Sequence, residues 1–251
     1  PWAHLHQLKN HNKTTHIMRK IKAYEISAET SPATPPATPT TGIASTPPTM
    51  GVVVGDIDSS DINMPRLNIV QGVGSLSELF SPGQVVMNQE IVLSNGTTPI
   101  ELTVLAARKQ FVENLAYDAE SRPRVFDTLD EVHAAGGSIN WIGNMRPSFV
   151  PVLHVNVLIK APQGVEGSFP IHYNGEDYAL AVWTLRGVAY GKAGKSILTA
   201  AKFGLQDGLY HGRWTLSTKR EKFGRNSVFV PVLRNTGRHD ADFVKFVTSL
   251  S

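Results

Sequence analysis

Alternation of apolar and polar residues with a period of two is the feature that most limits what this chain can fold into. It is clearest in Phe149–Lys160 (FVPVLHVNVLIK), where Val150, Val152, Val155 and Val157 stand beside polar or turn-forming residues. Successive side chains of a strand point to opposite faces, so this period predicts strands that are half buried in a sheet.

The same pattern recurs along the chain. It predicts six strands, over residues 84–93, 99–108, 149–160, 178–189, 212–218 and 228–233. The turn Ser94–Gly96 joins the first two. Pro151 and Pro231 interrupt two of the runs. Because proline cannot donate a hydrogen bond to a neighbouring strand, we expect both strands to lie at an edge or to carry a bulge.

Two short helices complete the expected fold. Ser196–Leu205 has apolar residues at helical spacing behind a candidate N-cap, and Asp240 is the candidate N-cap of a second helix that ends at Leu250. Many strands with two short helices predict a mostly β protein, either an OB-like barrel or a small β-sandwich.

The N-terminal part lacks this periodicity. Residues 31–49 contain six Pro, six Thr and no charge, so residues 1–51 are expected to form a disordered, Pro/Thr-rich extension. Residues 1–17 precede a Met and hold four of the nine His at irregular spacing. They read as an upstream extension or, alternatively, as a metal-binding tract. Residues 52–251 are expected to form one β-rich, nucleic-acid-binding domain.

Composition excludes several classes of protein. The chain has no cysteine, which removes disulfide scaffolds, thiol catalysis and cysteine-ligated metals. It has no apolar run of about 18 residues and no visible signal peptide, so we expect a cytoplasmic protein without a membrane partner.

Charge is distributed unevenly behind a formal net value of +3. Residues 186–251 hold 12 Lys and Arg against 4 Asp and Glu, whereas residues 1–185 hold 12 against 17. A basic C-terminal quarter indicates either a surface that meets nucleic acid or a solvated face with no partner.

Aromatic residues are interleaved with these cations. Arg213 and Trp214 adjoin on one predicted strand, and a predicted hairpin loop, residues 219–226, carries Phe223 among four cations: Lys219, Arg220, Lys222 and Arg225. Cations on such a loop would contact phosphates, and Phe223 would stack on a base. Trp214 lies two residues before Leu216, so it reads equally well as a core residue.

Further candidates stand outside this loop. They are Arg108, Lys109 and Phe111 at the end of a strand, Trp141 and Arg146 in a loop, and Arg186, Lys192 and Lys195. By contrast, Trp183 shares a face with Leu185 and is expected in the core.

Residues 189–196 (AYGKAGKS) fit a relaxed phosphate-loop pattern, in which Lys195 and Ser196 would meet a nucleotide and Mg²⁺. No apolar strand ending in Asp follows it, and the preceding strand is amphipathic, so a Gly-rich turn before a helix is the preferred interpretation. No other catalytic or metal-ligating pattern stands out. We expect a protein that is not an enzyme and has no cofactor and no metal.

The order of features resembles a family of tailed-phage proteins. The matching segments are Met64–Gly72 (MPRLNIVQG), Ser81–Gly83, the stretch from Trp183 to Leu205, Trp214–Lys219 and Val228–Val232. Members are taken to be single-stranded DNA-binding proteins with an OB-like barrel. The cysteine-rich insertion of many members is replaced here by residues 118–147, and the chain lacks an acidic C-terminal tail, so recruitment of partners by such a tail is not expected.

Residues and resemblance together predict a sequence-tolerant single-stranded DNA-binding protein that acts in phage DNA replication or recombination inside the bacterial host. DNA is favoured over RNA, and a homo-oligomer is left open. A structural protein of the virion is the alternative, and a nucleotide hydrolase that uses residues 189–196 is a distant third.

Overall fold

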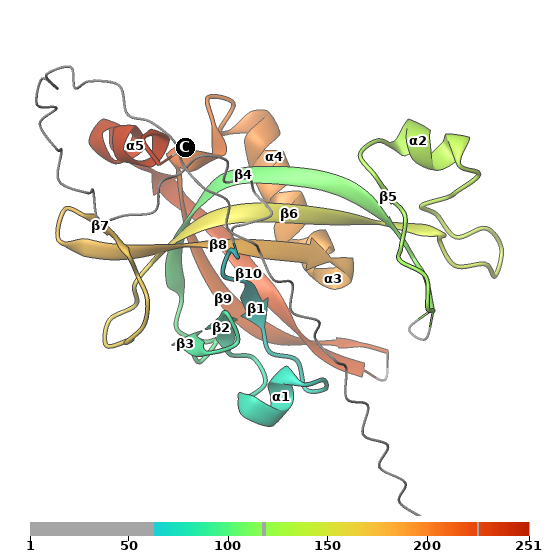
Figure 1. Cartoon of the computed structure of the whole chain (residues 1–251), viewed down its shortest axis with the longest axis horizontal. Helices are drawn as coiled ribbons and strands as arrows, with labels where there is room; N and C mark the ends of the chain where they lie inside the picture. Colours follow the sequence, from blue (N-terminus) through green and yellow to red (C-terminus); the bar gives the residue numbers. More distant parts are fainter. Residues whose placement is uncertain (1–62, 117–118, 225, 251) are drawn as a thin grey trace, which may run out of the picture. The chain divides into compact units, whose positions relative to one another are not determined.

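The computed structural model describes residues 63–116, 119–224 and 226–250 (Figure 1). The expected N-terminal extension, residues 1–51, lies outside the described residues. The described chain is mostly β, with two sheets and a few short helices, as its alternating pattern predicts.

The larger sheet is antiparallel throughout and has the order β10-β9-β4-β6-β8-β7, with β5 pairing beside β4. Its strands are β4 (Ile100–Glu113), β5 (Val125–Phe126), β6 (Phe149–Lys160), β7 (Ile171–Tyr173), β8 (Glu176–Arg186), β9 (Gly212–Phe223) and β10 (Asn226–Arg238). Strand β6 has the predicted bounds. The sheet does not close, because its two end strands, β10 and β7, do not pair with each other. The predicted mostly β fold with short helices is therefore confirmed, and among the described residues it is not closed into the OB-like barrel that was one of its two predicted forms.

A second, three-stranded sheet contains β1 (Leu67–Ile69), β2 (Val85–Met87) and β3 (Ile91–Ser94). The strand predicted at 84–93 is therefore a hairpin. Asn88 and Gln89 have φ values of 53° and 60°, the left-handed conformation that a tight hairpin turn requires at both central residues. Asn adopts this conformation more readily than most residues. Asn88 is therefore a turn signal inside the apolar run, which the alternating pattern alone does not reveal.

The two faces of the large sheet are buried differently. The inner face, which carries Leu102, Val155, Trp183 and Trp214, forms the main core with the small sheet and with Ile197. Trp183 is a core residue, as predicted. The outer face carries a second cluster, in which Leu158 and Tyr178 pack against Phe243 and Val247.

Both predicted helices are present, as α4 (Lys195–Phe203) and α5 (Ala241–Thr248). Asp240 caps α5, since its Oδ1 accepts a hydrogen bond from the backbone N–H of Phe243 at 2.8 Å. The remaining helical segments are short: α1 (Leu76–Leu79), α2 (Leu129–Ala134), α3 (Gly187–Ala189), the π-helix η1 (Tyr190–Gly194) and the 3₁₀-helix η2 (Leu209–His211). Within the described ranges, no helix has both the length and the apolar character needed to cross a membrane.

The exposed edge of β10 is protected against further strand pairing. The side-chain amide of Gln71 donates to the backbone O of Phe229 (2.9 Å) and accepts from its N–H (3.0 Å), as a neighbouring strand would. Pro231, two residues after Phe229 on the same edge, has no backbone N–H and so cannot donate a hydrogen bond to a further strand. Pro231 thus lies on an edge strand, as expected, and Pro151 lies one residue beyond the point where β8 stops pairing with β6.

Candidate nucleic-acid interface

The basic segment 219–226 is a regular two-stranded ribbon and not the expected loop. β9 and β10 pair from Gly212–Arg238 out to Phe223–Asn226, so only the tip at Gly224 turns. We call Lys219–Phe223 with the facing residues Asn226–Val230 the basic ribbon. Arg225, another predicted phosphate contact, lies outside the described residues.

Strand alternation divides the side chains of the basic ribbon between two faces. Lys219, Glu221 and Phe223 project on one side, and Arg220 and Lys222 project on the other. All of them except Glu221 are exposed, and the Phe223 side chain keeps 43% of its surface in solvent. An aromatic ring exposed among cations fits a surface for nucleobases.

One carboxylate ties the basic ribbon to the helical segment beside it. Glu221 lies 2.7 Å from Lys219 Nζ and 3.0 Å from Lys192 Nζ of η1. Hydrogen bonds from Lys219 and then from Lys192 lower the pKa of the Glu221 carboxyl. Sequence positions almost thirty residues apart are thereby brought to one surface, as the nucleic-acid hypothesis requires.

The phosphate-loop pattern is helical. Residues 187–203 run as α3, η1 and α4 without a break, and the predicted N-cap Ser196 lies inside the helical segment. The backbone N–H of Lys195 donates to Tyr190 O within this segment. The loop of free amides that cradles a nucleotide phosphate is therefore missing at residues 189–196, although Lys192 and Lys195 remain exposed.

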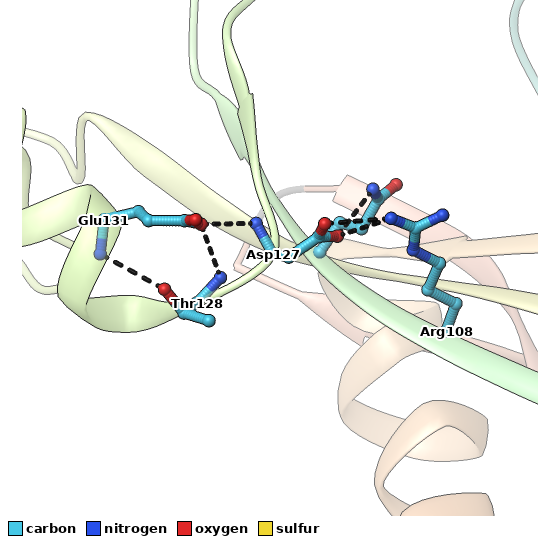
Figure 2. A network of polar contacts seen from close by, with 5 residues as sticks. Arg108, Asp127, Thr128 and Glu131 are labelled. Atoms are coloured by element: carbon cyan, nitrogen blue, oxygen red, sulfur yellow. Dashed lines mark hydrogen bonds and ion pairs between the residues drawn. The ribbon is translucent and has the colours of Figure 1, made fainter.

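The candidates at the end of β4 have other partners. Arg108 donates through Nη2 to both carboxylate oxygens of Asp127 (2.8 and 3.0 Å), and Gln110 donates to the same carboxylate at 2.9 Å (Figure 2). The hydrogen bond from Arg108, followed by that from Gln110, lowers the pKa of Asp127. Asp127 is held in turn by the N-terminus of α2, where Glu131 accepts from its backbone N–H.

Phe111 does not have the predicted role. It is 4% exposed and packs with Val132 and Phe149 in a small core at this end of the sheet. A buried ring cannot stack on a base, so Phe111 is removed from the interface. Lys109 stays exposed, with Nζ 4.8 Å from the centre of the Phe111 ring.

Trp214 is also a core residue, with 2% exposure. Its ring lies over Gly212, where a Cβ would stand 2.8 Å from Trp214 Nε1. Of its two predicted roles, the core role is the one that the structure supports. The adjoining Arg213 is exposed and lines an outer-face pocket with Lys160, Tyr178 and His239. Burial lowers the pKa of His239 to about 4.

The remaining candidates are dispersed. Trp141 (63% exposed) and Arg146 lie in the loop before β6, where Ile142 and Met145 bond to each other across a turn. Arg186 ends β8 on the outer face. The predicted residues therefore fall in separate regions, and the basic ribbon with η1 is the largest group that the fold assembles.

The carboxylates that neutralise cations could not be identified from the sequence, because each is distant from the residue it meets. Asp127 is 19 residues from Arg108, and Glu113 is 11 residues from Arg124. Thr128 and Glu131 form a capping box, a signal that predicts α2 and hence the position of Asp127. Across the described ranges, no group of three or more His, Asp or Glu is arranged to hold a metal ion.

Comparison with known proteins found no matching family model, curated protein or solved structure.

Proposed function

We propose that the chain is a non-enzymatic, sequence-tolerant single-stranded DNA-binding protein, and that the basic ribbon with Lys192 and Lys195 is its contact surface. The observation that carries this proposal is an excess of exposed cations on the two faces of the basic ribbon and on the adjoining helical segment. Lys219 and Lys192 share the carboxylate of Glu221 on one face, whereas Arg220 and Lys222 are exposed on the other face. Lys195 is exposed on the helical segment that begins with α3.

The chemistry of the basic ribbon favours the nucleic-acid backbone over a particular sequence. Lysine and arginine side chains reach phosphates without reading base edges. Phe223 offers a flat ring, and stacking tolerates any base because every base has a π-face. Such a surface binds a single strand whose bases are free to stack.

The resemblance to tailed-phage single-strand binders supports the same proposal. Two of its matching segments, Trp214–Lys219 and Val228–Val232, lie in β9 and β10, the strands whose outer ends form the basic ribbon. We accordingly place the protein in phage DNA replication or recombination in the host cytoplasm.

The first experiment is a fluorescence-anisotropy titration of a labelled dT oligonucleotide of about 30 bases at several salt concentrations. Counterion release predicts that the logarithm of the affinity falls linearly with the logarithm of salt concentration. Unlabelled duplex DNA serves as the competitor. The major groove admits a two-stranded β-ribbon, so displacement by duplex would contradict the single-strand preference.

Phe223→Ala tests the stacking role. We expect a loss of about 1–3 kcal/mol in binding free energy, the usual value of one stacked base. Phe203→Ala, which removes an equally aromatic side chain with 77% exposure on α4, is the matched control. Absence of oligonucleotide binding at low salt would overturn the proposal and would bring the virion-component alternative forward.

A further inference from the structure

Three large apolar side chains are gathered at the tip of the loop before β6. Trp141, Ile142 and Met145 keep 63%, 57% and 65% of their surface exposed. They are three of the nine exposed large hydrophobic side chains among the described residues, and they fall within five positions of the chain. Clustered apolar side chains on a surface mark a site of association. We call these three residues the apolar tip.

Hydrogen bonds hold the apolar tip in one conformation. The backbone N–H of Ile142 donates to Met145 O at 3.2 Å, and the N–H of Met145 donates to Ile142 O at 3.0 Å. Between them, Gly143 has the left-handed φ of 57°, which glycine adopts without steric cost. At the base of the loop, Ser148 Oγ accepts from the N–H of Ser138 at 2.8 Å. A preformed tip loses little conformational entropy when it docks.

The same chain carries an apolar pocket that fits such a tip. Its volume is about 210 Å³, and it is lined by the β2–β3 turn, by the segment that leads into β7 and by β8. A cavity of about 150 Å³ holds a benzene molecule, so this pocket has room for the ring of an aromatic side chain. We call it the Ile91 pocket, and its apolar lining includes Met87, Ile91, Pro170, Ile171 and Ala179.

The charges beside the tip and the pocket are complementary. Arg146 directly follows the apolar tip, and Glu90 lines the Ile91 pocket. Both residues are exposed, and neither has an ion-pair partner within the described part of the chain. Opposite charges at the two sites favour one orientation of a docked tip.

The apolar tip cannot reach the pocket of its own chain. The loop enters β6 at Phe149, whereas Ala179 of the Ile91 pocket pairs with Ile159, ten residues or about 33 Å along the same strand. The eight residues from Phe149 back to Trp141 span at most about 29 Å when fully extended. Figure 1 shows α2, which precedes the loop, and β7 at opposite ends of β6. A tip and a pocket so placed join neighbouring copies in a row.

We propose that the apolar tip of one copy docks in the Ile91 pocket of a second copy, with Arg146 beside Glu90, so that copies line up head to tail. The contact is small, because one docked aromatic ring buries roughly 150–250 Å², far below the roughly 1,200 Å² of a stable interface. Copies are therefore joined weakly in free solution and more firmly when one DNA strand holds them side by side. Only this last step rests on the proposed function.

Disulfide trapping between copies tests the contact without DNA. The chain has no cysteine, so full-length Asn144→Cys and Ser168→Cys can be mixed, and only the introduced residues can pair. Asn144 lies in the turn of the tip, Ser168 lines the pocket, and both are exposed. Asn144→Cys mixed with Lys202→Cys, an exposed position on α4, is the control pair. We expect the test pair to cross-link about tenfold faster, as a raised local concentration requires. Equal rates would overturn the proposal.

Two sets of further substitutions test the apolar and charged parts of the contact. Trp141→Ala in the tip variant should bring the rate of the test pair down to that of the control pair. Arg146→Glu in the tip variant, or Glu90→Arg in the pocket variant, should slow cross-linking about threefold, as loss of an exposed ion pair does. The two charge substitutions together should restore the rate, and an unrestored rate would contradict the placement of Arg146 beside Glu90.

Oligonucleotide binding separates failure of this contact from failure of the proposed function. On a dT oligonucleotide that holds several copies, the unaltered chain should bind cooperatively and Trp141→Ala should not, while both should bind equally to one that holds a single copy. Fast cross-linking without any DNA binding would refute the proposed function and leave the contact established. Weaker binding of Trp141→Ala to the short oligonucleotide would show that Trp141 touches the strand, and would count against the docked tip.

Discussion

The end of β4 and the basic ribbon both gather arginine, lysine and phenylalanine, but the two regions neutralise and bury them differently. At the end of β4, Arg108 meets Asp127 and Arg124 meets Glu113, while Phe111 is buried. In the basic ribbon, Glu221 pairs with both Lys219 and Lys192, and Phe223 remains exposed. Basic–aromatic composition therefore does not identify an interface until the positions of the carboxylates are known.

The largest expected difference between the two regions is in folding stability. Phe111→Ala should lower the free energy of unfolding by about 3–5 kcal/mol, because it empties part of a packed core. Phe223→Ala should change it by about 0.5 kcal/mol, as surface substitutions do. Urea unfolding of both variants measures this difference, and equal losses would break the comparison.

For oligonucleotide binding the order of the two regions should be reversed, with the larger effect from substitutions in the basic ribbon. The double variant R220A/K222A removes two exposed cations of the basic ribbon, and it should reduce the slope of log affinity against log salt by about one to two. R108A/R124A removes two cations that carboxylates already neutralise, so it is the matched control and should leave the slope nearly unchanged. Anisotropy titrations of the same oligonucleotide compare them, and equal reductions would contradict the contrast.

A smaller effect should follow from releasing a neutralised cation. Asp127→Asn removes the partner of Arg108, whose side chain is 68% exposed. If charge balance separates the two regions, this variant should strengthen oligonucleotide binding and steepen the salt dependence by about one. Asp242→Asn, which alters a more exposed pair with Lys245 on α5, is the control. No change in either variant would show that the end of β4 lies away from the bound strand.

The smallest expected effects are changes in the pKa values of the carboxyl groups that pair with these cations. The pKa of Asp127 is lowered chiefly by Arg108, so R108A should return it toward the usual value of about 3.9, while R220A should not move it. Since the folded-state pKa is depressed, the pair stabilises the fold above the unfolded-state pKa, and this contribution is lost as pH falls through the folded-state pKa. NMR titration of the carboxyl resonances of Asp127 and Glu221 would follow both regions, and an unmoved Asp127 in R108A would refute the assigned cause.

Much of the secondary structure could be predicted because strands and caps depend on near neighbours. The alternation in Phe149–Lys160 gives β6 its observed bounds, and Asp240 caps α5 as a local hydrogen bond. The secondary-structure predictions were wrong where one local pattern is compatible with two different structures. Asn88 and Gln89 turn an apolar run into a hairpin, and the Gly-rich residues 190–194 continue a helix because Ala193 is buried in the core.

The candidate site was predicted only in part, for a related reason. The positions of Arg220, Lys222 and Phe223 at an exposed hairpin follow from charge and strand spacing. Trp214 and Phe111 also lie close to cations in the sequence, but both are buried in the structure. Leu205 packs in the same core cluster as Trp214, and Val132 packs against Phe111, so tertiary packing removes both rings from the surface.

By itself, the sequence determined a strand-rich chain with a basic C-terminal quarter, since periodicity and composition act over a few residues. Only the tertiary structure decided which cations keep their charge exposed. Asp127 reaches Arg108 from 19 residues away, and Glu221 reaches Lys192 from 29 residues away, so each pairing depends on where the folded strands bring the carboxylates.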